Sequence, residues 1–365
     1  MLSGRTVFPV SGKIAENKGI NLFRRGMIAS VLSEDPKRKS CAAFFLRRNG
    51  ENMVNERKCA VVGCGNVGAA CAYTLACSGL FSELVLIDAN GMKAEGEAMD
   101  ISDGLPFLSP MRVAAGSYRD IAECGCVVVA AGANQKQGET RLELLKKNVR
   151  IIEDVCRSVS EYNDEAVLLI VTNPVDVLTT VAQRASGYPK SRVLGSGTVL
   201  DTARMKQLLG ERLGLDPRNV HSIIIGEHGD SEVPVWSSSN ISGVDLAGFC
   251  GLDRCADPQL LDGIFTAVRD SAYRIIERKG ATYYAIAQSV LRILRAIVRD
   301  EDSILPVSTF PEGHYGIDEI ALGVPAIVGR GGVKKVLDIP LSAEEREQLL
   351  ESAARLSEAL DGLKD

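Results

Sequence analysis

The sequence KCAVVGCGNVGAACAYTLACS, residues 58–78, is the strongest indication of the fold class. It begins as a short apolar strand, passes through a glycine-rich turn and ends in a helix of small residues. In the turn, Gly63 permits a tight bend, Gly65 lets the main chain approach a pyrophosphate, and Gly68 lets the helix pack on its strand. The helix N-terminus then receives the anion. We expect this dinucleotide-binding turn to contact its cofactor through Gly63, Gly65, Asn66, Val67 and Gly68.

A second apolar strand is expected at 84–87 and ends in Asp88, 20 residues beyond Gly68. A carboxylate at this place accepts hydrogen bonds from the adenine-ribose hydroxyl groups and repels a 2′-phosphate, so NAD is favoured over NADP. Further strands are expected at 126–130 and 167–171, with helical patterns between them. The sequence therefore predicts an α/β protein with a Rossmann-type doubly wound parallel sheet, followed by a mixed α/β substrate domain.

Two turns follow the third and fourth of these strands, Ala131-Gly132-Ala133 and Thr172-Asn173-Pro174. Open α/β sheets bind their ligands at the carboxyl ends of the strands. We therefore expect Gly132, Ala133 and Asn173 to lie at the cofactor.

Composition supports a globular protein with room for two domains, since the 365 residues are 45% hydrophobic and 24% charged. A net charge of −5 argues against a general nucleic-acid or anionic-membrane binder. The sequence lacks an apolar run of 18 residues, so a membrane span is not expected. It also lacks a C-x-x-C pair for zinc, and no metal site is predicted. The cysteines, including Cys59, Cys64, Cys71 and Cys77, are expected to be buried free thiols of a cytoplasmic protein.

The first 52 residues differ in charge from the rest of the chain. They carry ten Lys or Arg against four acidic residues, a net of about +6, which leaves about −11 for the remainder. Three interpretations stay open: in-frame upstream sequence before a start at Met53, an organelle transit peptide, or a disordered extension. The nucleotide sequence upstream of Met53 would distinguish among them, and no function is assigned to 1–52.

His228 is the candidate acid/base residue. It is one of three histidines and follows an apolar strand expected at 223–225, in the motif GEHGD. Oxidising a secondary alcohol requires a base for the hydroxyl proton while hydride leaves the carbon, and imidazole exchanges protons near neutral pH. His228 could therefore serve both directions of such a reaction.

Three further side chains complete the expected site. Asp201 could fix the tautomer of His228, or it could merely cap the following helix. Arg204, one helical turn later, presents a guanidinium fork for a substrate carboxylate. The polar stretch Gln135–Arg141, with its Gly hinge, resembles a lid in which Arg141 polarises a carbonyl oxygen. Surface salt bridges are the alternative role for both arginines.

From about residue 56 to the C-terminus the chain resembles the L-lactate/malate dehydrogenase family. The motifs that carry the resemblance are GCGNVG at 63–68, AGANQK at 131–136, GETRL at 138–142, TNPVD at 172–176, DTAR at 201–204, GEHGD at 226–230 and KGATYY at 279–284. VPVWS at 233–237 and LPVS at 305–308 are similar to its bacterial lactate-specific branch.

The resemblance implies a role for each site residue. His228 is the proton donor and acceptor, with Asp201 as its partner. Arg204 anchors the substrate carboxylate and Arg141 polarises the carbonyl. Asn173 contacts substrate and cofactor. It also implies a homotetramer. We predict an NAD-binding domain at about 57–196 and a substrate domain at about 197–361, which ends in an amphipathic helix at 343–363.

The family position that discriminates substrates is occupied by Gln135, where malate-specific members carry Arg. A second substrate carboxylate would need a cation opposite it, whereas the methyl group of pyruvate needs only a neutral contact. Thr282, which borders the substrate side chain in the family, is also small and neutral. We therefore expect reversible conversion of (S)-lactate and pyruvate, a small 2-hydroxy acid and its 2-oxo acid. Malate or another L-2-hydroxy acid is the alternative substrate, and a non-catalytic NAD-binding protein is the alternative class.

Many bacterial members bind fructose 1,6-bisphosphate between subunits through an Arg and a His. The matching positions here are Lys206 and His221. Lysine holds phosphate as a point charge but lacks the bidentate fork of arginine, so activation by this effector stays open.

Overall fold

The computed structural model describes residues 54–133, 138, 140–250 and 258–363, and Val54–Asp365 form one compact unit. Two predicted features fall outside the described residues, namely the basic segment 1–52 and Gln135. The backbone of Arg141 is described and its side chain is not.

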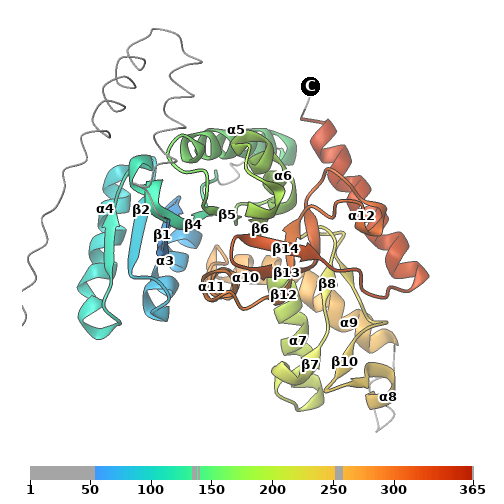
Figure 1. Ribbon diagram of the computed structural model, residues 1–365. Coiled ribbons are helices and arrows are strands. Elements are labelled where there is room, and N and C mark those ends of the chain that lie inside the picture. Colours follow the sequence, from blue (N-terminus) through green and yellow to red (C-terminus); the bar gives the residue numbers. More distant parts are fainter. Residues whose placement is uncertain (1–53, 134–137, 139, 251–257, 364–365) are drawn as a thin grey trace, which may run out of the picture. The chain divides into compact units, whose positions relative to one another are not determined.

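A nine-stranded sheet forms the centre of the molecule (Figure 1), in the order β14-β13-β12-β6-β5-β4-β1-β2-β3. The six strands from β3 to β6 are parallel, which confirms the predicted Rossmann-type sheet. Its strands are β1 Asn55–Val62, β2 Glu83–Ile87, β3 Arg112–Ala115, β4 Cys124–Val129, β5 Val167–Ile170, β6 Val193–Gly195, β12 Ser303–Thr309, β13 Leu322–Gly329 and β14 Gly332–Val336.

The sheet does not end where the parallel strands end. Strand β12 pairs antiparallel to β6, with Ser308 opposite Gly195, and β13 and β14 continue the antiparallel pairing. Two smaller sheets flank the site, one of β7 Val220–His221, β10 Asn240–Ile241 and β11 Val244–Asp245, the other of β8 Ile224–Ile225 and β9 Val233–Pro234.

Some helices cover the two faces of the large sheet, and others pack on a small sheet or on one another. Their bounds are α3 Asn66–Ser78, α4 Gly91–Asp103, α5 Arg141–Ser160, α6 Val175–Ser186, α7 Val199–Leu213, α8 Leu246–Cys250, α9 Pro258–Arg269, α10 Ser271–Lys279, α11 Tyr284–Arg299 and α12 Ala343–Asp361. Apolar residues of α5, α6 and α12 form one core cluster with the sheet, and those of α3, α4 and α11 form the other.

Successive residues of β1 point into different clusters. Ala60 and Val62 belong to the first, and Cys59 and Val61 to the second. This alternation explains why the strands are continuously apolar, because a parallel sheet covered by helices is buried on both faces.

The seven cysteines whose side chains the structure describes are free thiols, as expected, and six of them are buried. Burial raises the pKa of Cys71 to about 12, so its thiol is inert at neutral pH. The expectation of burial was wrong for Cys77, which is exposed because it lies on the outer face of α3 with Tyr73, opposite Leu75. Among the described residues, no helix is long and apolar enough to cross a membrane.

Candidate active site

The glycine turn joins β1 to α3 with little room for side chains. Gly63 has a φ of +96°, and its N–H donates to the carbonyl of Ile87 at 2.7 Å. A Cβ added to Gly68 would lie 1.7 Å from the Gly63 carbonyl oxygen, so only glycine lets the helix approach the turn this closely. This position is needed by the fold itself.

Gly65 differs from its neighbours because a Cβ added there would meet no atom within 4 Å. It is the N-cap residue of α3, and no side chain caps this helix end. Asn66, Val67 and Gly68 form the first turn of that helix. Uncapped N–H groups beside open space fit a pyrophosphate, whose negative charge the helix end stabilises.

Asp88 lies next to this turn, at the end of β2. Its carboxylate accepts hydrogen bonds from the main-chain N–H groups of Cys64 at 2.7 Å and Asn90 at 2.9 Å. These bonds fix the side chain beside the glycine turn, at the place where a ribose hydroxyl pair would be bound. The uncapped N–H groups of α3 and the carboxylate of Asp88 therefore fit the pyrophosphate and the ribose of NAD.

A buried side chain absent from the sequence predictions, Asn148 of α5, joins the two other strand-end turns. Its Oδ1 accepts from the Ala133 N–H at 2.8 Å, and its Nδ2 donates to the Asn173 carbonyl at 3.2 Å. Gly132 is also constrained, since a Cβ there would lie 2.5 Å from the Thr172 Cγ2. The peptide bond between Asn173 and Pro174 is cis.

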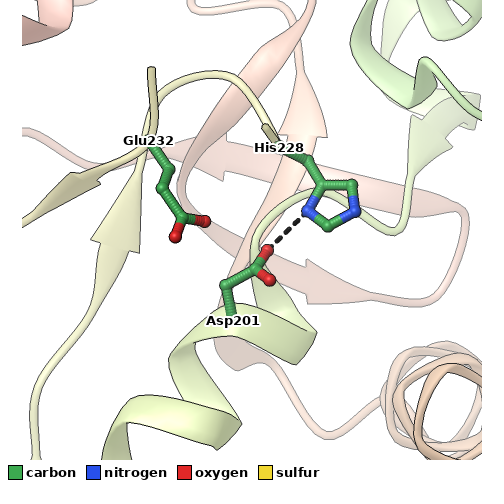
Figure 2. Close-up of side chains that lie close together, drawn as sticks. All are labelled: Asp201, His228 and Glu232. Carbon is green, nitrogen blue, oxygen red and sulfur yellow. Dashed lines mark hydrogen bonds and ion pairs between the residues drawn. The ribbon is translucent and has the colours of Figure 1, made fainter. Parts of the chain in front are cut away.

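The predicted acid/base residue and its partner are brought together from two elements (Figure 2). Nδ1 of His228 lies 2.6 Å from the Asp201 carboxylate, which is buried in the first turn of α7. Because a carboxylate only accepts hydrogen bonds, Nδ1 is the donor and Nε2 is left to face a substrate. Arg204, one turn along α7, donates to the other oxygen of Asp201 at 2.9 Å. The hypothesis that Asp201 orients His228 thus has the geometry it requires.

Burial and charge act in opposite directions on this group. Burial opposes a charged imidazole, but the neighbouring Asp201 outweighs it, and the pKa of His228 is raised to about 9. Burial would likewise raise the pKa of Asp201, yet His228 and Arg204 together lower it. At neutral pH the pair is therefore an imidazolium and a carboxylate, ready to donate a proton.

Two carboxyl groups near His228 were not predicted. Asp176 of α6 accepts the main-chain N–H of His228 at 2.8 Å and is fully buried, and burial raises its pKa to about 6. Glu232 precedes β9 and has an oxygen within 4.8 Å of ligand atoms of both Asp201 and His228. The only sequence signal was proximity, since Asp176 ends the TNPVD motif and Glu232 lies four residues after His228.

For the remaining predicted residues the structure gives the element and the exposure. Thr282 is half-buried in the segment between α10 and α11, and Asn173 is exposed. Lys206 is half-buried on α7, where burial lowers its pKa, and His221 is exposed in β7, which packs on α7. Their assignments to substrate and effector stay predictions.

Family comparisons agree with this arrangement. Residues 57–195 match the lactate/malate dehydrogenase NAD binding domain, and residues 198–365 match the alpha/beta C-terminal domain of the same family. The NAD binding match confirms the predicted cofactor.

Named relatives and solved structures cover most of the chain. The L-lactate dehydrogenase of Acetivibrio thermocellus is 48% identical over 84% of this chain and 97% of its own length. L-lactate dehydrogenase 1 of Clostridium acetobutylicum is 49% identical over 85% and 100%. The crystal structure of a lactate dehydrogenase from a Medee basin deep-sea metagenome library superposes with a TM-score of 0.83 at 43% identity, over 86% of this chain and 100% of its own. The minor L-lactate dehydrogenase of Enterococcus mundtii gives 0.82 at 40% identity, over 84% and 98%. With two matching domains in order and the His228–Asp201 pair within the second, this chain belongs to the lactate/malate dehydrogenase family.

Proposed function

We propose that this protein is an NAD-dependent L-lactate dehydrogenase that interconverts (S)-lactate and pyruvate. The observation that carries the proposal is the contact between His228 and Asp201, with Arg204 on the second oxygen of the same carboxylate. It places an acid/base group and a carboxylate-binding group on one side of a single site, as a 2-hydroxy acid requires.

Each residue then has a step to perform. Bound NADH supplies the hydride. The charged His228 donates its Nε2 proton to the oxygen of the substrate carbonyl, while Asp201 keeps the imidazole in place and stabilises its charge before transfer. Arg204 holds the substrate carboxylate through N–H groups that Asp201 leaves available. Lactate oxidation runs the same steps in reverse, with neutral His228 accepting the hydroxyl proton.

We further assign Arg141 to polarising the carbonyl, Asn173 to contacts with substrate and cofactor, and Gln135 and Thr282 to the substrate methyl. The supporting argument is chemical, because a neutral pair opposite a methyl group leaves no buried charge unpaired. The domains are assigned as 57–196 for NAD and 197–361 for substrate, and the protein as cytoplasmic.

A panel of 2-oxo acids tests the activity. NADH oxidation should be fastest with pyruvate and slower with oxaloacetate and 2-oxoisocaproate. Replacing Gln135 by Arg should move the preference toward oxaloacetate by at least about tenfold in kcat/KM, since the new cation pairs with the second carboxylate. Replacing Gln135 by Asn is the matched control and should keep pyruvate preferred. A wild-type preference for oxaloacetate would overturn the substrate assignment.

We also propose a homotetramer that binds fructose 1,6-bisphosphate through Lys206 and His221. Both residues come from adjoining elements and are basic, as an anion site requires. Light scattering should give a tetramer, and the effector should lower KM for pyruvate in the wild type but not in Lys206→Ala. Equal KM values with and without the effector would remove this part of the proposal.

A further inference from the structure

Glu232 is a buried carboxyl group in the catalytic cluster to which the mechanism assigns no role. Its residue is only 6% exposed, and Figure 2 shows its carboxyl group turned toward the Asp201–His228 pair. Its Oε1 has no hydrogen-bond partner in the described part of the chain. An ionised carboxylate without such partners is costly to bury, so the placement favours a protonated acid.

The charges around Glu232 come from three parts of the chain. Asp201 and Arg204 face it from α7, His228 faces it from its own loop, and Arg269 faces it from α9. Asp176 of α6 acts on the other side of His228. Burial is the largest influence, Asp201 adds to it, and the three cationic groups oppose it. The result is a pKa of Glu232 raised to about 8, so Glu232 carries its proton at neutral pH.

A bridging metal ion is a poorer explanation for the free oxygen. Asp201, His228 and Glu232 do offer three ligand atoms close enough for one. However, Arg204 already donates to Asp201 at 2.9 Å, and its positive charge would repel a second cation at the same carboxylate. A proton on Glu232 removes the buried negative charge without that repulsion.

Glu232 can also exchange this proton with water. It lines a cavity of about 630 Å³ between β9, α9 and α12, together with Asp230, Trp236, Asp262 and Glu351. Glu232 is therefore adjacent both to the acid/base pair and to a water-accessible space, which lets its protonation follow the pH of the solution.

We infer that Glu232 is a positioning residue whose proton sets the pH at which His228 becomes a base. The inference rests on the proposed function. With Glu232 neutral, the charges of Asp201 and Arg204 cancel and His228 leaves one positive charge for an anionic substrate. Once Glu232 ionises, its negative charge stabilises the imidazolium of His228 and repels the substrate carboxylate. Both effects move the onset of lactate oxidation to higher pH, because this reaction needs neutral His228.

Replacing Glu232 by Gln tests this directly, since glutamine has the shape of the protonated acid and never ionises. The profile of kcat/KM for lactate against pH should shift its midpoint down by about one unit, which is about a tenfold gain below the midpoint. Glu232→Asp, which keeps the acid, should remain near the wild-type midpoint. Asp262→Asn, which removes an exposed carboxylate of the same cavity, should leave the midpoint unchanged.

An NMR titration of the imidazole signals provides a readout that needs no turnover. The chain has three histidines, and His228→Gln identifies the signal of interest. Glu232→Gln should lower the titration midpoint of His228, and Glu232→Met should do the same if the glutamine variant does not fold. An unchanged His228 midpoint would overturn the inference. A wild type inactive with all 2-oxo acids would instead overturn the proposed function and leave this titration informative.

Discussion

His228 is surrounded by acids that act on it in different ways. Asp201 accepts from its ring at 2.6 Å, and Asp176 accepts from its main chain at 2.8 Å. The first carboxylate sets the charge and tautomer of the imidazole, whereas the second fixes the loop that carries it. Removing the first should therefore change proton affinity as well as rate.

Asp201→Asn should lower kcat/KM for pyruvate by about 10² to 10⁴, because an amide neither stabilises the imidazolium nor enforces the tautomer. Burial alone would lower the pKa of His228, but Asp201 raises it to about 9. Without the Asp201 carboxylate this pKa should fall, and the alkaline limb of the profile of kcat/KM for pyruvate against pH should move to lower pH. NADH binding, followed by fluorescence, is the control and should be preserved. A lower rate with an unmoved alkaline limb would contradict this role.

Where a motif supplied the chemistry, the predicted side chains do lie together in the structure, and their roles stay predictions. His228, Asp201 and Arg204 were found by type and spacing, and the structure brings them within hydrogen-bond distance. Asn148 and Asp176 were not found because each acts across the fold, and Glu232 was not found because no motif marks it, although it is only four residues from His228. Asn148 is 15 residues from Ala133, and Asp176 is 52 residues from His228. Such contacts depend on packing, which local sequence does not encode.

Among the elements, the unit formed by β1, the glycine turn and α3 contains glycines that are needed for two different reasons. Gly68 is required because the turn carbonyl occupies the place of a Cβ, and Gly65 stands in open space at a helix end. Strands and helices of this unit were predicted to within a few residues, with β1 starting at Asn55 rather than 58. The short strand β8 was shorter than expected, because its pairing with β9 covers only two residues.

Alanine at these two glycines should give opposite phenotypes. Gly68→Ala should lower the melting temperature, since backbone must move to relieve a 1.7 Å contact. Gly65→Ala should melt like the wild type but bind NADH at least about tenfold more weakly, because its methyl group occupies the space of the pyrophosphate. Calorimetry and NADH fluorescence measure the two effects. Gly91→Ala, a helical glycine with open space around it, is the control. Normal NADH affinity in Gly65→Ala would show that the cofactor lies elsewhere.

For the whole molecule, the sequence predicted the class of sheet but not its extent. Strands β12 to β14 were assigned to no sheet, and they extend the parallel strands through a pairing more than 100 residues distant in sequence. Antiparallel additions of this kind depend on which edge is left uncovered, which local patterns do not reveal. Both core clusters consequently contain residues from the two predicted domains.

The buried acid/base groups should make the stability of the whole molecule depend on pH. His228, Glu232 and Asp176 have pKa values raised to about 9, 8 and 6, so each binds its proton more tightly when folded. Their contributions to the free energy of unfolding are complete at pH values below the pKa values of these groups in the unfolded chain. The contributions are lost as the pH rises through the pKa values of the same groups in the folded protein. The pKa of Asp201 is lowered in the folded protein, so its contribution to stability has the opposite pH dependence and is lost only as the pH falls into the acid range.

The melting temperature should therefore fall by several degrees between pH 6 and pH 9. The melting temperature of Glu232→Gln should fall less over this range, because glutamine has no proton to lose. The melting temperature of Asp262→Asn should change as that of the wild type does. Scanning fluorimetry across this range measures all three. A melting temperature that is constant or rises toward pH 9 would contradict the buried, protonated state of these groups.

The pairing of β6 with β12 also bears on how members of this family can be recombined. Gly195 and Ser308 meet across the junction of the two matched domains, and the apolar layers above and below them are shared. A chimera that joins the first half of this chain to the second half of a relative has to preserve the β6–β12 pairing and the shared core packing around it, as well as a linker. Crossovers that inherit β6, β12 and their covering helices from one parent are thus the ones we expect to yield active hybrids.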